Sequence, residues 1–114
     1  MDAIIEQKSF RFAIRIVNLY RFLRYQKKEF VLSKQLLRSG TSIGANIAEA
    51  EQAQSRADFI AKLNIALKEA AETNYWLRLL RATDYLTDSE FQSIHCDCKE
   101  VERMLTAIIK STKK

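Results

Sequence analysis

The side chains of this sequence with the widest chemical range are its single histidine and its two cysteines, His95, Cys96 and Cys98. Imidazole and thiolate groups are the common ligands of zinc, but this spacing is unlike the paired clusters of structural zinc sites. Cys98 also falls on an apolar stripe of helical spacing, so we interpret it as a core residue. We therefore expect no metal site, and a single histidine excludes most catalytic triads.

Three carboxylates, Glu49, Glu69 and Glu72, could approach one another in a helical fold. Four-helix bundles that hold two iron ions use Glu-x-x-His pairs, and the sequence contains no such pair. We expect these glutamates to pair with Arg38, Lys68 or hydroxyl groups. The sequence thus predicts a protein that is not an enzyme, with no cofactor and no small-molecule substrate.

The stretch LLRSGTSIGANIAEA at 36–50 contains both glycines of the chain, Gly40 and Gly44, and the chain has no proline. A phosphate-binding turn is one interpretation, but neither the GxxxxGK[ST] nor the GxGxxG pattern is present. Four apolar residues instead continue with helical spacing through the glycines: Leu32, Leu36, Ile43 and Ile47. This pattern predicts an unbroken helix whose small residues let a neighbouring helix approach closely.

Polar residues of the same stretch, Ser39, Ser42 and Asn46, fall on the opposite shoulder of this helix. Buried polar groups need hydrogen-bond partners. We expect Glu69 or Thr73 of the next helix to supply them.

Helix boundaries follow from capping signals and polar breaks. Ser55–Asp58 and Thr87–Glu90 have the spacing of capping boxes, and a polar run at 25–29 separates two earlier apolar segments. We predict one domain, 1–114, with helices at about 3–26, 31–53, 56–84 and 88–112. Matched lengths and short connections predict an all-α, antiparallel up-down-up-down four-helix bundle.

The first helix has two apolar rows, which together cover about 220° of its surface. One row contains Phe10, Ala13, Ile14 and Val17, and the other contains Phe12, Ile16, Leu19 and Leu23. One core needs about half of that surface, so we predict a homo-oligomer. The candidate interface combines the second row with two residues of the third helix: Phe12, Ile16, Leu19, Leu23, Trp76 and Leu79.

The chain is basic, with a net charge of +5 and a pI near 9.4. In an up-down bundle, eight basic residues fall at one end, which we call the basic pole: Arg21, Arg24, Lys27, Lys28, Lys34, Arg38, Arg78 and Arg81. Four acidic residues share this end: Glu29, Asp84, Asp88 and Glu90. Such a surface can bind phosphate backbones, and Tyr25 and Tyr85 could stack on bases. A solvated charged end that aids solubility is the alternative.

The N-terminal segment MDAIIEQKSF carries acidic residues and no long apolar run, and no segment approaches the roughly 20 apolar residues that span a membrane. We expect a cytoplasmic protein that does not bind membranes.

Two blocks, LSKQLLRSGTSIGANIAEA and SRADFIAKLNIALKEAAETNYWL, resemble the bacterial ribosomal-RNA intervening-sequence proteins. The resemblance implies a four-helix bundle assembled into a homopentameric ring, and it marks Ser39, Ser42, Asn46 and Glu49 of the first block as structural signature positions. Glu69 and Glu72 of the second block share this role, and the closely packed Gly40 and Gly44 complete the predicted structural signature. The chain is also similar to the accessory protein of diversity-generating retroelements, a basic pentamer thought to bind nucleic acid.

These observations together predict a non-catalytic, homo-oligomeric bundle that binds RNA or DNA through its basic pole. The alternative is a protein-interaction scaffold with no nucleic-acid role.

Overall fold

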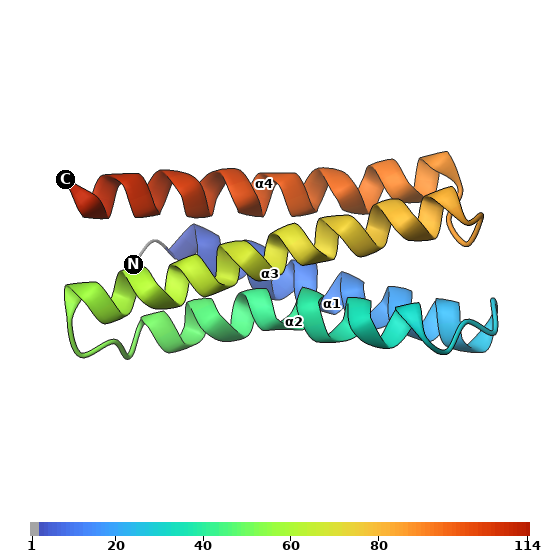
Figure 1. The fold of residues 1–114 in the computed structure, drawn as a ribbon, viewed down its shortest axis with the longest axis horizontal. Helices are drawn as coiled ribbons and strands as arrows, with labels where there is room; N and C mark the ends of the chain where they lie inside the picture. The colour runs from blue at the N-terminus through green and yellow to red at the C-terminus, as the bar shows by residue number, and fades with distance from the viewer. Residues whose placement is uncertain (1–2) are drawn as a thin grey trace.

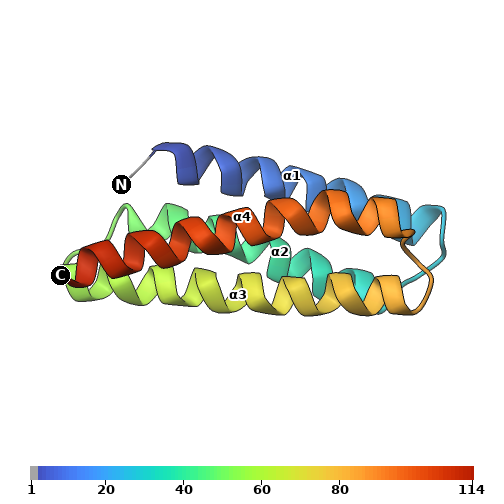
Figure 2. The same cartoon turned by 90° about the horizontal axis from the view of Figure 1, so that it is seen from above.

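The protein folds as an all-α bundle in a computed structural model that describes residues 3–114. Its helices are α1 (Ala3–Tyr25), α2 (Leu32–Ala50), α3 (Arg56–Ala82) and α4 (Asp88–Lys113). Consecutive helices run antiparallel, and contacts pass from α1 to α2, α3 and α4 and back to α1 (Figures 1 and 2). The predicted up-down-up-down topology is therefore confirmed, in a rod with extents of 44 × 20 × 19 Å.

Each of the last three helices begins at a side chain that accepts its free backbone N–H groups. At α4 the Thr87 hydroxyl accepts from the Glu90 N–H at 3.1 Å, and the Glu90 carboxylate accepts from the Thr87 N–H at 2.8 Å, a complete capping box. At α3 the Ser55 hydroxyl accepts from the Asp58 N–H at 3.0 Å. At α2 this side chain is Glu29, which the sequence did not predict as a cap.

Apolar side chains from all the helices meet along the axis of the rod. Residues that are fully enclosed, with less than 2% of their surface exposed, include Ile5, Leu36, Leu63 and Leu105. Cys98 is also completely buried, as its place on the apolar stripe predicted.

The glycines lie inside α2, which is helical from Leu32 to Ala50 without interruption. A Cβ atom added to Gly40 would stand 2.7 Å from Cγ1 and Cγ2 of Ile16 in α1. A Cβ atom on Gly44 would stand 3.4 Å from the backbone oxygen of Ser9, also in α1. The small-residue row therefore faces α1, and the phosphate-binding turn is excluded because these residues are helical.

The interface predicted on the first helix is wrong for three of its residues. Phe12, Ile16 and Leu23 are at most 1% exposed and belong to the core of the single chain. Leu19 and Trp76 are partly buried and pack against this core, and Leu79 is partly exposed. The outward row is the other one, in which Phe10 is 68% exposed and Ile14 is 48% exposed.

Candidate nucleic-acid interface

The basic pole lies where α1 and α3 end and where α2 and α4 begin. Figures 1 and 2 show the α1–α2 and α3–α4 connections side by side at this end of the rod. Seven of the eight predicted basic residues belong to these helix ends and connections: Arg21, Arg24, Lys27, Lys28, Lys34, Arg78 and Arg81. The bundle topology alone thus brings together cations that are up to 60 residues apart in the chain, from Arg21 to Arg81.

These seven side chains point their charges toward solvent. Arg21, Lys27, Lys28, Lys34 and Arg78 are exposed, while Arg24 and Arg81 are half-buried. None of the ion pairs found within residues 3–114 includes any of the seven. Their positive field is therefore not cancelled by direct carboxylate contacts in the described chain.

Arg38 departs from the prediction, because it is committed to the neighbouring helix. Its guanidinium donates to Glu69 at 2.9 Å and also to Glu72, both on α3. Glu72 accepts a further bond from the indole N–H of Trp76 at 2.9 Å. The hydrogen bonds from Trp76 and then from Arg38 lower the pKa of Glu72. Arg38 thus links α2 to α3, and its charge is balanced by two carboxylates there.

Aromatic rings lie among the basic side chains at the end of α1. The Arg24 guanidinium carbon is 5.9 Å from the ring centre of Tyr25 and 5.3 Å from that of Phe30. Arg81, on the other side of the pole, is 4.0 Å from the ring centre of Phe91. Cations at such distances from an aromatic face are attracted to its negative charge, so both arginines are held near the surface.

Glu29 is an acidic residue of the pole that is turned inward. Its carboxylate accepts from the backbone N–H groups of Val31 at 3.2 Å, Leu32 at 3.0 Å and Ser33 at 2.6 Å. Burial would raise its pKa, but these bonds outweigh that effect and lower it. Glu29 therefore caps α2, and the N–H groups it occupies are not free to bind a phosphate. From the sequence, Glu29 was predicted only as one of the four acidic residues of the basic pole, because its position does not match the spacing of a capping box.

The predicted polar signature of α2 is a packing feature. The hydroxyl of Thr73 in α3 bonds the Glu69 carbonyl at 2.8 Å and pairs with the Ser39 hydroxyl at 3.0 Å, in the interior of the bundle, as expected. Ser42 and Asn46 donate instead to backbone carbonyls of their own helix, those of Arg38 and Ser42.

The third glutamate of the signature is separate from the other two. Glu49 pairs with Lys62 at 3.2 Å, where the sequence had suggested Lys68 for one of the glutamates. Glu69 and Glu72 share Arg38 as their partner, whereas Glu49 pairs with Lys62, so the three carboxylates form no common site.

The side chains of His95, Cys96 and Cys98 lie in different surroundings. His95 hydrogen-bonds Asn74 at 2.8 Å and stacks on Phe91, with 4.6 Å between ring centres. Cys96 is exposed, whereas Cys98 is buried and its thiol contacts the Ala70 carbonyl at 3.6 Å. Within residues 3–114, no three His, Cys, Asp or Glu side chains lie close enough together to hold a metal ion.

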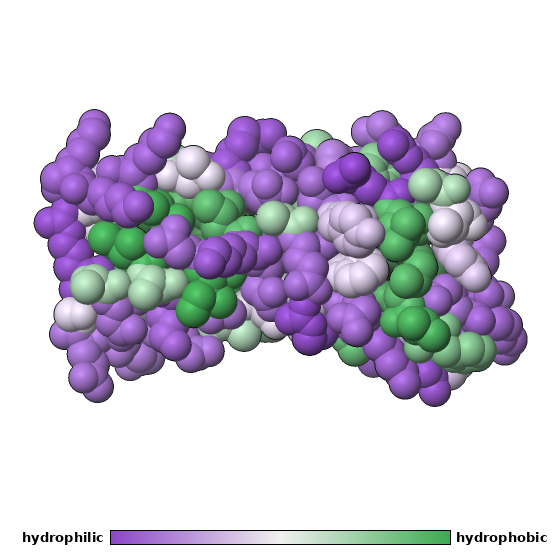
Figure 3. All heavy atoms as spheres, in the orientation of Figure 1, coloured by the Kyte–Doolittle hydropathy of each residue, from purple (hydrophilic) through white to green (hydrophobic). Residues whose placement is uncertain are grey.

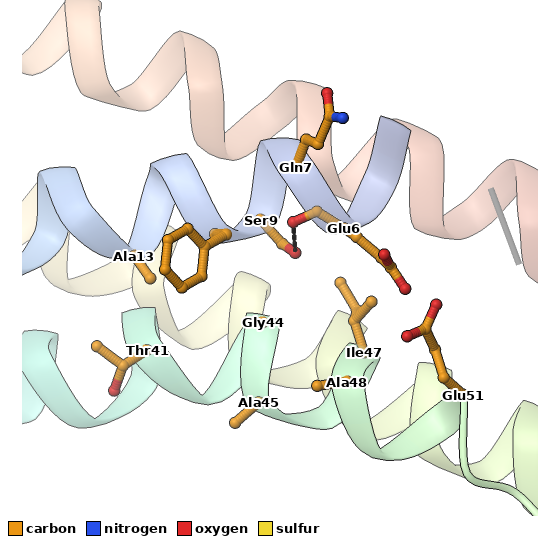
Figure 4. A pocket seen from close by; sticks show the side chains of 11 residues that line it. Glu6, Gln7, Ser9, Ala13, Thr41, Gly44, Ala45, Ile47, Ala48 and Glu51 are labelled. Carbon is orange, nitrogen blue, oxygen red and sulfur yellow. Dashed lines mark hydrogen bonds between the residues drawn. The ribbon is translucent and has the colours of Figure 1, made fainter. Parts of the chain in front are cut away.

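A second surface feature is an apolar groove of about 610 Å³ between α1 and α2. Gly44, Ala45 and Ala48 of α2 line it (Figure 4), and so does Phe10 of α1. The carboxylates of Glu6 and Glu51 point toward one another at one end of the groove. One carboxylate oxygen of Glu6 is buried and has no hydrogen-bond partner among the described residues.

Hydrophobic residues also reach the surface elsewhere. Figure 3 shows them in two areas of the face formed by α2 and α3, one toward each end of the rod, separated by hydrophilic residues. Ile65 and Tyr75 of α3 are 44% and 52% exposed. No helix among the described residues combines the length and the hydrophobicity that crossing a bilayer requires.

Comparisons with known proteins agree with this architecture. None of the curated proteins matches the chain. One solved structure is the crystal structure of a protein with unknown function from the S23 ribosomal protein family of Bacteroides thetaiotaomicron VPI-5482. It is 64% identical, with a TM-score of 0.95, over 96% of this chain and 97% of the other. The model of the 23S rRNA-intervening sequence protein family matches residues 1–107. The chain therefore belongs to the 23S rRNA-intervening sequence protein family.

Proposed function

We propose that this protein is a non-catalytic, homo-oligomeric bundle of the cytoplasm that binds RNA or DNA through its basic pole. The observation that carries the proposal is the group of seven cations at one end of the rod, none of them in an ion pair of the described residues. Phosphate backbones bind such surfaces by releasing condensed counterions. The only strongly buried acidic residue of the pole, Glu29, is turned away from that surface.

Reversing two exposed cations tests this proposal. Arg21 and Lys34 are exposed and make no described ring contact, so Arg21→Glu/Lys34→Glu should leave the fold intact. We expect the double variant to bind labelled RNA and DNA at least ten-fold more weakly in fluorescence anisotropy. The slope of log affinity against log salt should fall by about two, because each phosphate contact contributes roughly 0.9.

A matched control reverses the same number of charges at the opposite end of the rod. Lys110 and Lys113 are exposed near the end of α4, so Lys110→Glu/Lys113→Glu changes the net charge equally. Equal loss of affinity in the two variants would contradict a localised interface. Binding that does not weaken with salt would contradict the electrostatic basis of the proposal.

The groove between α1 and α2 supports the proposed self-association. Phe10 lines the groove, Ile14 lies one helical turn further along α1, and both are exposed in the single chain. Ile65 and Tyr75 of α3 are also exposed, so a second helix offers hydrophobic side chains outside the groove. Head-to-tail contact between two different surfaces forms a closed ring when the rotation between subunits closes, which is compatible with the proposed pentamer.

Phe10→Glu should therefore lower the molar mass measured by light scattering, while Tyr25→Glu should not. Both residues are more than 60% exposed aromatics, but Tyr25 lies at the basic pole and outside the groove. A wild-type monomer at micromolar concentration would overturn the self-association. The groove would then favour the second candidate function, a scaffold that recruits a different protein.

A further inference from the structure

The connection between α1 and α2 exposes aromatic rings within the basic pole. Tyr25 is 62% exposed and Phe30 is 47% exposed, and the adjoining Val31 is 71% exposed. None of the three belongs to the apolar core or to the hydrophobic residues packed against it. The end of α1 and the connection that follows it thus present apolar surface to solvent where the rest of the pole is charged.

The sequence predicted that Tyr25 and Tyr85 stack on bases, but the structure favours Phe30 over Tyr85 as the second ring. Tyr85 is half-buried and packs against the core, so its ring is not free for a ligand. Phe30 takes this role, because the Arg24 guanidinium lies 5.3 Å from its ring centre and 5.9 Å from that of Tyr25. Arg24 therefore joins the two rings into one group, which we call the Tyr25–Arg24–Phe30 platform.

The charges around the platform favour an anionic ligand. Lys27, Lys28 and Lys34 are exposed on the same connection and the first turn of α2. Glu29 would oppose an anion, but it is 7% exposed and its carboxylate is occupied by the N–H groups of α2. A phosphate backbone at this surface would therefore meet exposed lysines. The two rings and the Arg24 guanidinium lie among these lysines.

Aromatic and cationic groups arranged in this way recognise unpaired nucleotides. Every base has a π-face that can stack on a ring, whereas in a duplex those faces are already covered by neighbouring base pairs. Sequence reading of a duplex needs a helix or a β-ribbon in the major groove. Here α1 and α3 end and α2 and α4 begin at the pole, and the platform consists of the last two residues of α1 and Phe30 of the connection.

We propose that the Tyr25–Arg24–Phe30 platform makes the basic pole selective for single-stranded segments of RNA or DNA over duplexes. This inference rests on the proposed nucleic-acid binding and specifies its substrate class. The cations supply attraction to any phosphate backbone, and the rings supply the preference for unpaired bases.

The test compares an unstructured single-stranded 20-nucleotide RNA, the matching DNA strand, and the two corresponding duplexes. Fluorescence anisotropy at fixed salt should show at least ten-fold tighter binding of the single strands. Tyr25→Leu/Phe30→Leu should weaken single-strand binding by roughly ten-fold or more, since stacking on each ring contributes substantially. Duplex affinity and the salt slope should remain unchanged, because no charge is altered.

Tyr75→Leu is the matched control, since Tyr75 is a 52% exposed tyrosine on α3 away from the pole. It should leave all four affinities unchanged, and circular dichroism should show intact helices in every variant. Equal binding of single strands and duplexes, or no effect of Tyr25→Leu/Phe30→Leu, would overturn the inference and leave the electrostatic proposal standing. Absence of salt-dependent binding to all four probes would overturn both.

Discussion

The backbone of α2 at Gly40 lies directly against the side chain of Ile16 in α1. A Cβ atom at Gly40 would approach two carbon atoms of Ile16 to 2.7 Å, inside van der Waals contact. Ile16 is completely buried and branched at Cβ, so it has little freedom to move aside. Gly40→Ala should therefore destabilise the protein by about 1–3 kcal/mol, the usual cost of overpacking a core. Urea unfolding measures this difference.

Gly44→Ala is the internal control for that prediction. Its added Cβ would stand 3.4 Å from the Ser9 backbone oxygen, which is close to ordinary contact. Alanine gains up to about 1 kcal/mol over glycine inside a helix, so Gly44→Ala should be neutral or stabilising. Equal destabilisation by the two substitutions would show that Ile16 is not the cause.

A second prediction concerns the buried hydroxyl pair that joins α2 to α3. The Thr73 hydroxyl lies 3.0 Å from that of Ser39, and both residues are fully buried. Thr73→Val should cost about 1–2 kcal/mol, since it removes the buried partner of the Ser39 hydroxyl. The double variant Ser39→Ala/Thr73→Val should cost less than the sum of the single changes, because removing both groups leaves neither unsatisfied.

Chemical denaturation of the four proteins in this cycle gives the coupling energy. Strict additivity would contradict the assignment of the two hydroxyls to one interaction. Thr41→Val serves as a comparison, since the Thr41 hydroxyl donates only to carbonyls of its own helix, at 2.7 Å and 3.4 Å.

The sequence predicted the bundle because its signals are local. The Thr87 capping box and the unbroken apolar period through Gly40 depend on neighbours in the chain, and both appear as expected. The outward face of α1 was predicted wrongly because both of its apolar rows have helical spacing. The choice between the rows of Phe10 and Phe12 is made by the close approach of α2, which is a property of the assembled fold.

The sequence predicts the basic pole in part, because the order of the helices determines which end of the bundle each charged residue occupies. Helix order locates Arg21 and Arg78 at one end, and the expected pairing of glutamates with Arg38 is confirmed for Glu69 and Glu72. The positions of Phe30 and Glu29 were not predicted. Each depends on the path of the α1–α2 connection, where Lys28 has a positive φ of 56° and turns the chain back.

Glu29 gives a prediction on pH dependence. The folded protein lowers the pKa of Glu29 below its ordinary value of 4.5, through backbone bonds that outweigh burial. Its stabilising effect is thus complete above the unfolded pKa and is lost as pH falls through the lower folded pKa. Glu29→Gln should cost about 1 kcal/mol at pH 7, as the loss of a helix cap does. The cost should shrink as pH falls below about 4.5.

Unfolding free energies at pH 7, 5 and 3.5 test this dependence. Glu100→Gln removes the same charge from the surface ion pair with Lys8, in which both side chains are well exposed. Such pairs contribute less than about 1 kcal/mol, so this control should have a smaller effect at pH 7. A cost of Glu29→Gln that stays constant from pH 7 to 3.5 would contradict the charged cap.

The two cysteines should differ in reactivity although one residue separates them. Burial raises the pKa of the Cys98 thiol to about 12, so almost none of it is thiolate at pH 8. Since the thiolate is the reactive form, Cys98 should resist a disulfide reagent while exposed Cys96 reacts. Absorbance with Ellman's reagent should show one rapid equivalent in the native protein and a second only in denaturant. Cys96→Ser should remove the rapid equivalent, and two rapid equivalents in the native protein would place Cys98 outside the core.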